Sequence, residues 1–317
     1  MQYFLYNDID NHKFTEDEDV LKFYAKLDDN DIWSTVKVWM DSKDKILFSA
    51  DGFGKFGTLD TEEDWACEAR RYYFNIVGKY GAPVQALLKK AAGLDIQMIC
   101  PLHGPILNNN LSHYLNLYDK WSSYTPEEDG VVLAYASIYG NTKDAVMKLA
   151  SMLKDANHPN VVVYDLARSD VSMVVAEAFR YSKLVLASST YNMDIFPHMK
   201  EFINHLTERN FQNRTVALIE NGSWSPNAIK VMKEMLAGCK NLKYTQVSVK
   251  ILSSLNDESY LQLENLAKEL SQDYVKKEVV FKNDLKALCY FLYPLLQSYL
   301  LLLKYLCLWE SYPLNFQ

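Results

Sequence analysis

The clearest pattern in the chain is the alternation of short apolar runs with amphipathic stretches after residue 130. Five runs rich in Val, Leu, Ile and Ala have the length of buried strands: Val131–Ala136, Val161–Asp165, Leu184–Ser188, Val216–Ile219 and Tyr244–Val249. Apolar residues recur at helical spacing in the stretches that follow them: 143–154, 171–181, 198–209, 226–238 and 258–271. Parallel strands need crossover helices, so the pattern predicts an α/β fold with a doubly wound, five-stranded parallel sheet.

The residues ahead of this repeat have a mixed pattern. Two strands joined by a hairpin turn are predicted at Val36–Met40 and Ile46–Ala50, followed by a helix over 62–77 with one apolar face. That face is formed by residues at helical spacing: Trp65, Ala69, Tyr72, Tyr73 and Ile76. The polar segment Ser122–Gly130 is typical of a linker. We therefore expect one domain over residues 1–124 and a second over 130–272.

A phosphate-binding loop is the first candidate for chemistry. Residues 137–142 lie between the first predicted strand of the repeat and its helix, where an α/β sheet holds an anion against a helix N-terminus. Ser137 and Thr142 supply hydroxyls, Gly140 lets the backbone approach and Asn141 tolerates unusual dihedral angles. The spacing is not that of an NTPase loop, which disfavours triphosphate chemistry.

Two further loops follow the third and fourth predicted strands of the repeat. One spans Ser189–Pro197 and the other Glu220–Pro226, and each combines hydrogen-bonding groups with an aromatic ring. Aromatic rings beside backbone donors suit a flavin, although each loop alone is also explained by helix capping or core packing. Together they predict FMN binding by the following residues: Ser137, Ile138, Tyr139, Gly140, Asn141, Thr142, Thr190, Tyr191, Asn192, Asn221, Gly222, Ser223 and Trp224.

These loops also carry a family resemblance. Ser-x-x-Gly-Asn-Thr resembles the FMN phosphate loop of flavodoxins, and the Thr190–Asn192 and Glu220–Trp224 segments resemble the other FMN loops of flavodiiron proteins. The likeness covers roughly residues 32–272. It implies a flavodoxin-like sheet of order 2-1-3-4-5, preceded by a partial metallo-β-lactamase-like αββα domain. It also implies an electron donor such as rubredoxin or a flavin reductase.

The resemblance does not extend to the complete metal site of that family. Asp51 matches the bridging carboxylate and His103 the last histidine, but none of the six histidines belongs to a His-x-Glu-x-Asp-His run, and Ile32 stands where the family has a histidine. Two irons need several imidazole and carboxylate donors. A vestigial metal site at Asp51 and His103 is the most that we expect, and no diiron centre is expected.

The two ends of the chain have compositions of their own. Acidic clusters at 16–19 and 28–31 indicate a solvated edge segment or, alternatively, a cation site. Residues 273–317 form a Leu-rich tail in which 287–303 carry no charge. Three interpretations of the tail remain open: a helix packed on the protein or a partner, a non-native end, or a membrane contact, which is not favoured.

Composition narrows the class of protein. A formal net charge of −7 argues against nucleic acid as a partner, and 317 residues allow two cores. Five scattered cysteines without a Cys-x-x-Cys pair, and no visible signal peptide, predict reduced and mostly buried thiols in a cytoplasmic protein.

Three hypotheses for function follow. The first is an electron-transfer flavoprotein that binds FMN without a working diiron centre. The second is a subunit that forms a homodimer or associates with an intact homologue, because flavodiiron proteins typically pair head to tail. The third is a fragment of such a reductase, or a chain with a mis-assigned start.

Overall fold

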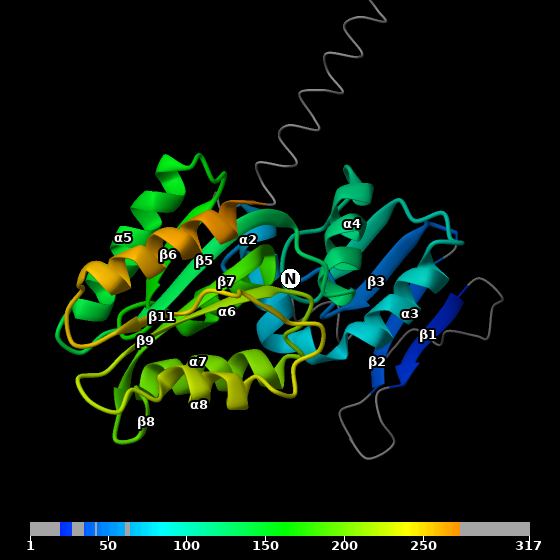
Figure 1. The fold of residues 1–317 in the computed structure, drawn as a ribbon. Coiled ribbons are helices and arrows are strands. Elements are labelled where there is room, and N and C mark those ends of the chain that lie inside the picture. Colours follow the sequence, from blue (N-terminus) through cyan, green and yellow to red (C-terminus); the bar gives the residue numbers. More distant parts are fainter. Residues whose placement is uncertain (1–19, 27–34, 42, 61–63, 273–317) are drawn as a thin grey trace, which may run out of the picture.

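The computed structural model describes residues 20–26, 35–41, 43–60 and 64–272, which form two sheets with their helices (Figure 1). The acidic clusters at 16–19 and 28–31, Ile32, and the Leu-rich tail at 273–317 lie outside the described residues. Among the described residues, no helix is both long and apolar enough to cross a membrane.

The larger sheet has the predicted flavodoxin-like order. Its strands are β5 (Glu128–Ala136), β6 (Val161–Asp165), β7 (Tyr181–Tyr191), β9 (Thr215–Asn221) and β10 (Lys243–Tyr244). They run in the order β10-β9-β7-β5-β6 and all these pairings are parallel, which is 2-1-3-4-5 in chain order. Two short strands join this path: β11 (Val249–Ile251) pairs with β9, and β8 (Asp194–Ile195) forms a hairpin with β7.

The fifth strand differs from the single run that the sequence suggests. It is split into β10 and β11, both paired with β9. Between the two pieces, the backbone N–H groups of Gln246 and Val247 donate to the carboxylate of Glu269, at 2.8 and 3.0 Å. A side chain therefore replaces the strand partner where the chain leaves the sheet.

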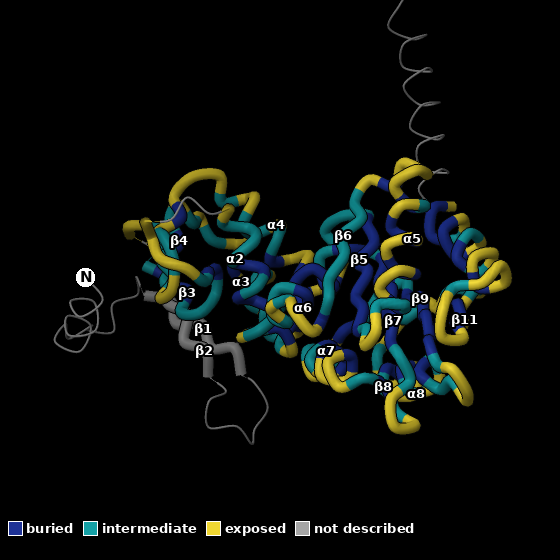
Figure 2. The backbone as a smooth tube through the Cα atoms, turned by 90° about the vertical axis from the view of Figure 1, so that its left-hand side faces the viewer, coloured by how far each residue is buried: buried dark blue, intermediate teal, exposed yellow. Residues whose placement is uncertain are grey.

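Helices cover both faces of this sheet. Helix α5 (Asn141–Asp155) and the helix over 257–272 pack on one face, and α6 (Val171–Arg180), α7 (Pro197–Glu208) and α8 (Ala228–Met235) pack on the other. Alternate residues of β5 enter the two cores, which is why that strand is apolar at nearly every position. Figure 2 shows the buried strands between exposed loops.

The smaller sheet has the order β1-β2-β3-β4. Its strands are β1 (Val20–Lys26), β2 (Thr35–Asp41), β3 (Ile46–Ala50) and β4 (Met98–Pro101), of which only β3 and β4 pair in parallel. Its helices are α2 (Trp65–Tyr72), a π-helical turn η1 (Tyr73–Val77), a 3₁₀ turn η2 (Gly78–Tyr80), α3 (Gly81–Ala91) and α4 (Leu111–Ser122). This is the partial lactamase-like domain that the resemblance implies.

The helix predicted over 62–77 begins as an α-helix and continues as a π-helical turn. The π turn η1 follows α2, and it places Phe74 in the core while Ile76 is 52% exposed. The prediction that Ile76 shares the apolar face with Ala69 and Tyr73 is wrong. A constant helical spacing no longer applies once the turn widens to i→i+5 hydrogen bonds.

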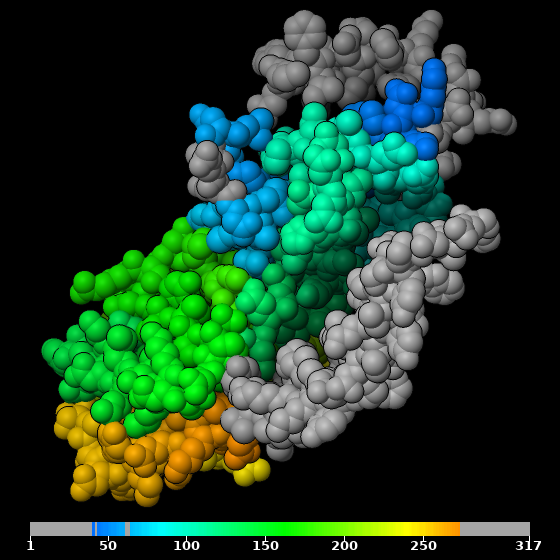
Figure 3. Space-filling view, turned by 90° about the horizontal axis from the view of Figure 1, so that it is seen from above, coloured from blue at the N-terminus to red at the C-terminus, as the bar shows by residue number. Residues whose placement is uncertain are grey.

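Phe74 also joins the two domains. Its ring stacks on Phe179 of α6 with centroids 4.1 Å apart, so one apolar core runs from the first domain into the α6 side of the second. Blue and cyan residues of the first domain abut green residues of the second in Figure 3. Apolar contact of this kind resists relative motion of domains.

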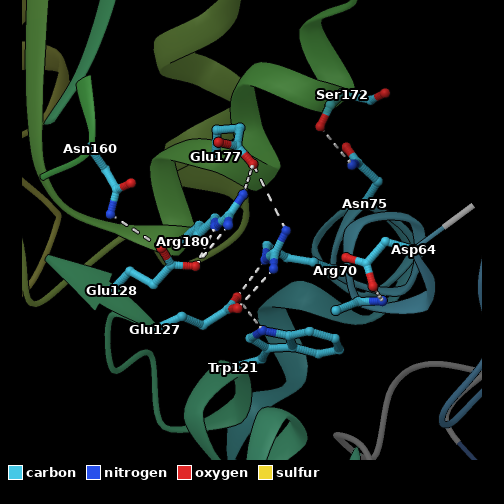
Figure 4. A network of polar contacts seen from close by, with 11 residues as sticks. Asp64, Arg70, Asn75, Trp121, Glu127, Glu128, Asn160, Ser172, Glu177 and Arg180 are labelled. Atoms are coloured by element: carbon cyan, nitrogen blue, oxygen red, sulfur yellow. Dashed lines mark hydrogen bonds and ion pairs between the residues drawn. The ribbon is translucent and has the colours of Figure 1, made fainter. Parts of the chain in front are cut away.

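A buried polar network also joins the two domains (Figure 4). Arg70 of α2 is 3% exposed and forms a bidentate ion pair with Glu127, which also accepts from the Trp121 indole at 2.6 Å. Arg70 also lies 3.8 Å from Glu177 of α6. Opposite charges that satisfy one another here fix the relative position of α2, α4 and α6.

The segment between the domains is anchored by its backbone. Helix α4 ends at Ser122 and β5 begins at Glu128, two residues ahead of the expected start of the second domain. The buried Arg214 donates to the carbonyls of Tyr124 and Phe179, and burial lowers its pKa to about 9. A guanidinium that binds carbonyls in place of a carboxylate pins this segment to the C-terminus of α6.

The described cysteines agree only in part with expectation. Cys67, Cys100 and Cys239 are free thiols, but they are half-buried rather than buried. Cys289 and Cys307 lie outside the described residues.

Candidate functional site: a crevice at the carboxyl edge of the parallel sheet

The three predicted loops leave neighbouring strands at the same edge of the sheet. Pairing of β5 with β7 reaches Ala136 and Ser188, and pairing of β7 with β9 reaches Ser189 and Asn221. Strand order reverses at β5 and β7, because β6 lies on the outer side of β5. In open α/β sheets, ligands bind at such a switch point, in the crevice outside the carboxyl ends of the strands. Helix α5 follows β5 and α7 follows β7 on opposite faces of the sheet, and we call the edge between these two helices the crevice.

The first loop is organised by Ser137. Its hydroxyl oxygen accepts from the backbone N–H groups of Gly140 and Lys143, at 3.2 and 3.3 Å. Two acceptor lone pairs are thereby used, and the hydroxyl hydrogen stays available to donate to an anion. Ser137 therefore caps the N-terminus of α5, and its role as a donor to a ligand stays a prediction.

Gly140 explains how the backbone can approach a ligand. It has φ +96°, which L side chains rarely adopt, and no atom lies within 4 Å of the position that a Cβ would take. The first-turn N–H groups of Asn141 and Thr142 have no acceptor within their own helix. The helix dipole adds positive potential there, so the loop suits a phosphate.

Thr142 links the first loop to the second. It is 1% exposed, and its hydroxyl shares a 3.1 Å hydrogen bond with that of Ser189 at the end of β7. Thr142 therefore acts through its N–H and its position in the loop rather than as an exposed hydroxyl.

The second loop is a tight hairpin. Thr190 pairs with Ile195 and Tyr191 with Asp194, so Asn192 and Met193 form the two-residue turn. Both turn residues have positive φ, +52° and +62°. The hairpin projects the Tyr191 ring, which is 49% exposed. Thr190 accepts at its hydroxyl from the N–H of Asn227, at 2.9 Å.

The third loop begins with Asn221, whose side chain already forms hydrogen bonds within the protein. The Asn221 side chain donates to the carbonyl of Ser253 at 3.0 Å and accepts from the N–H of Ser253 at 3.1 Å. Asn221 is 93% buried and extends the β9–β11 pairing by one step. It shapes the crevice rather than offering its amide to a ligand.

The rest of that loop is open. The N–H of Gly222 donates to Ile251, and a Cβ at Gly222 would lie 3.1 Å from Pro226, so the turn favours glycine. Ser223 and Trp224 are exposed, and the indole has 80% of its surface in solvent.

The residues around the crevice are of the kinds that suit a flavin mononucleotide. Tyr139 is 92% exposed beside the phosphate loop, while Tyr191 and Trp224 stand on the two neighbouring loops. Large aromatic groups normally bury much of their area, so three exposed rings around open backbone donors suit a flat aromatic ligand with an anionic tail. Ile138 is 41% exposed at the same rim, and Asn192 lies at the tip of the hairpin.

Four residues contribute to this edge although no sequence pattern had singled them out as site residues. They are Ser189, Glu220, Asn227 and Ser253. Ser189, Asn227 and Ser253 each form a hydrogen bond to a residue far away in sequence, whereas Glu220 accepts from Ile229 in the helix that follows it. Only Glu220 and Ser189 carry a local signal, since both border a predicted loop.

The first domain brings its two predicted metal ligands together. His103 Nε2 lies 3.6 Å from Asp51 Oδ1, and the Tyr72 hydroxyl donates to the same oxygen at 3.2 Å. Burial, together with the Asp51 carboxylate, raises the pKa of Tyr72, so its hydroxyl keeps its proton. Asp51 and His103 are both about half exposed.

This group does not fit a two-metal centre. Within the described part of the chain, no cluster of three or more His, Cys, Asp or Glu side chains could hold a metal ion. One carboxylate and one imidazole leave most coordination positions of two irons without a donor.

Comparison with known proteins supports the interpretation of the fold. No family model matches the chain. The anaerobic nitric oxide reductase flavorubredoxin of Pectobacterium carotovorum is 27% identical over 209 residues, which are 60% of this chain and 41% of that protein. The corresponding flavorubredoxin of Salmonella typhi is 26% identical over 208 residues, again 60% of this chain and 43% of the relative.

Solved structures agree with the sequence relatives. The rubredoxin oxygen:oxidoreductase of Desulfovibrio gigas superposes with a TM-score of 0.73 at 22% identity, covering 81% of this chain and 66% of the other. The flavodiiron protein of Giardia intestinalis gives 0.72 at 22% identity, with 81% and 64% covered. The chain is related to the flavodiiron proteins. It spans about two fifths of the length of the flavorubredoxins that it matches.

That relationship explains the pairing of the two domains. In the superposed flavodiiron structures the matched region likewise covers both, because 81% of this chain exceeds what either sheet contributes alone. The relation to flavodiiron proteins and the α/β fold class are thus confirmed, and the domain bounds stay predictions. The individual site residues stay predictions.

Proposed function

We propose that this chain is an FMN-binding electron-transfer flavoprotein that has no working diiron centre of its own. The supporting observation is the convergence of three loops at the switch point of the sheet, with an open glycine and three exposed aromatic rings. Bound FMN would supply one- and two-electron transfer.

The chain's own residues would divide the ligand between them. Ser137 donates its hydroxyl hydrogen, and the N–H groups of Tyr139, Asn141 and Thr142 face the phosphate at the N-terminus of α5. Tyr191 and Trp224 enclose the ring system and exclude water from its faces. Thr190, Asn221 and Gly222 hold the loops that carry those rings.

The proposal about iron rests on the donor set. The chain lacks the His-x-Glu-x-Asp-His run, and Tyr72 already donates to the Asp51 oxygen that faces His103. We therefore assign no reduction of dioxygen or nitric oxide to this chain alone.

Reconstitution with FMN tests the main proposal. The purified protein should become yellow and retain about one flavin per chain after gel filtration. Tyr139→Asp places a carboxylate beside the phosphate and should weaken binding about tenfold or more. Tyr139 is on the surface, so that variant does not threaten folding. Ile106→Asp, the same change on an exposed apolar side chain of the first domain, is the control.

A colourless protein that takes up no FMN would refute the proposal. Equal FMN affinity of the Tyr139→Asp variant and the parent protein would show that the phosphate binds elsewhere.

A second candidate function is a partner subunit that lends its flavin to an intact homologue, or a homodimer. It is favoured by the Asp51–His103 pair, which supplies only two candidate metal ligands. Co-purification with a full-length flavodiiron protein, with iron found only in the mixture, would support it. A stable monomer that does not bind a full-length flavodiiron protein would count against this second function. A protein electron donor, such as a rubredoxin or a flavin reductase, belongs to either function.

A further inference from the structure

Asn227 does not perform the role that its position predicts. It is the N-cap residue of α8, where an Asn side chain normally accepts from the second or third N–H of its own helix. Here the side chain makes no capping bond. Its amide instead donates to the carbonyl of Met193 on the β7–β8 hairpin, at 3.0 Å.

Glu220 caps the helix in its place. The carboxylate of Glu220, 7% exposed at the end of β9, accepts from the N–H of Ile229 in the first turn of α8 at 3.0 Å. A buried negative charge at a helix N-terminus is favourable. Because this donor is already satisfied, the Asn227 side chain is released for a contact between loops.

The hairpin needs such a contact. Its turn has two successive residues with positive φ, a conformation in which Asn-Gly is strongly preferred, but the second position is Met193. A side chain in this region strains the backbone. The bond from Asn227 to the Met193 carbonyl, with the bond from the Asn227 N–H to Thr190, holds the turn at two points.

We propose that Asn227 is a positioning residue of the flavin crevice. It fixes the hairpin that carries Tyr191 against the loop that carries Trp224, so that the two rings enclose one aromatic ligand. This inference rests on the proposed FMN function, because the ligand that the rings enclose is the flavin. The phosphate loop touches neither bond of Asn227, so ring enclosure and phosphate binding are separable.

Asn227→Asp provides the test. The change keeps size and the backbone N–H, but it sets a carboxylate oxygen against the Met193 carbonyl in place of a donor. Asn241→Asp is the matched control: Asn241 also bonds across loops, to Asn213, at the opposite edge of the sheet. Each variant is loaded with FMN and, separately, with riboflavin, which lacks the phosphate.

The expected result has three parts. Asn227→Asp still takes up FMN, but the fluorescence of bound flavin rises about twofold or more, since ring contact with Tyr and Trp quenches emission. Riboflavin affinity falls about fivefold, the size of one lost hydrogen bond. In the flavin-free protein, amide exchange in 191–194 becomes about fivefold faster, while 141–155 and the Asn241→Asp control are unchanged.

Unchanged amide exchange in 191–194 of the Asn227→Asp variant would overturn the inference, whether or not flavin binds. Unchanged fluorescence and riboflavin affinity in a protein that does bind FMN would overturn it as well. If the parent protein takes up neither flavin, the proposed function fails, and the exchange measurement alone decides whether Asn227 holds the hairpin.

Discussion

The crevice of the second domain and the Asp51–His103 pair of the first are both built where strands end, but they differ in how they are supported. Three adjacent parallel strands deliver three loops to the crevice, and bonds between loops, such as Thr142–Ser189, join them. The pair in the first domain is held by two loops and one tyrosine. Loops that leave neighbouring strands of one sheet can together form a whole binding site. Two side chains alone can hold a metal only if other parts of a protein add further ligands.

The junction between the domains gives the largest expected effect. Arg70→Met leaves Glu127 buried without its cation, while Glu177 keeps its ion pair with Arg180, and the change should lower the free energy of unfolding by about 3–5 kcal/mol. FMN binding at low temperature should survive, since the crevice belongs to the second domain. Urea unfolding measures the change. Arg168→Met, whose ion pair is exposed, should cost less than about 1 kcal/mol, and an equal loss in both variants would contradict the assignment of Arg70 as a buried anchor.

Ser137 gives the next effect and concerns the crevice alone. Ser137→Ala removes the acceptor for Gly140 and Lys143 and the donor that we propose for the phosphate. FMN should bind about tenfold more weakly or worse, as expected for the loss of a hydrogen bond to a charged group. Titration of FMN fluorescence measures the affinity. Ser151→Ala changes an exposed serine on helix α5 and is the control, and equal affinities for the two variants would remove Ser137 from the site.

We expect a smaller, pH-dependent effect on stability from His158, which lies at the opposite end of the strands from the crevice. Burial and the neighbouring Lys183 lower the pKa of His158, although Asp129 opposes the shift. The unfolded chain then binds a proton more readily than the folded one, so stability is full above pH about 6.5 and falls as pH drops below it. His158→Gln should flatten that part of the stability curve. The control variant His113→Gln changes an exposed histidine and should have the same stability curve as the parent protein. A stability curve of His158→Gln that runs parallel to that of the parent would refute the linkage.

The first-domain pair should give no effect on the flavin at all. Asp51→Asn combined with His103→Gln should leave the flavin content and the FMN affinity unchanged, because neither residue lies at the carboxyl edge of the parallel sheet. Elemental analysis alongside the flavin measurement extends the comparison to iron. Two irons per chain in the parent, lost in the double variant, would show that the first domain holds a metal centre after all.

Much of the second domain follows from local pattern. Val161–Asp165 is a strand with the predicted bounds, and the order of the parallel sheet follows from its crossover helices. The first domain follows less closely. Ile76 is exposed because a π turn interrupts α2, and no local spacing signals that turn. The split of the fifth strand depends on Glu269, which is distant in sequence.

The sequence by itself determined the class of fold and pointed to the loops at which we propose that a phosphate and an aromatic ring bind, because apolar periodicity and residues such as Gly140 act over a few neighbouring positions. Only the tertiary structure decided which side chains remain available. Asn221 is committed to Ser253, Asn227 leaves its own helix to hold Met193, and Glu220 caps in its place. Those assignments depend on which strands lie side by side. A hydrogen bond between loops leaves no periodic trace in the chain, since its partners are far apart in sequence and meet only when the sheet has formed.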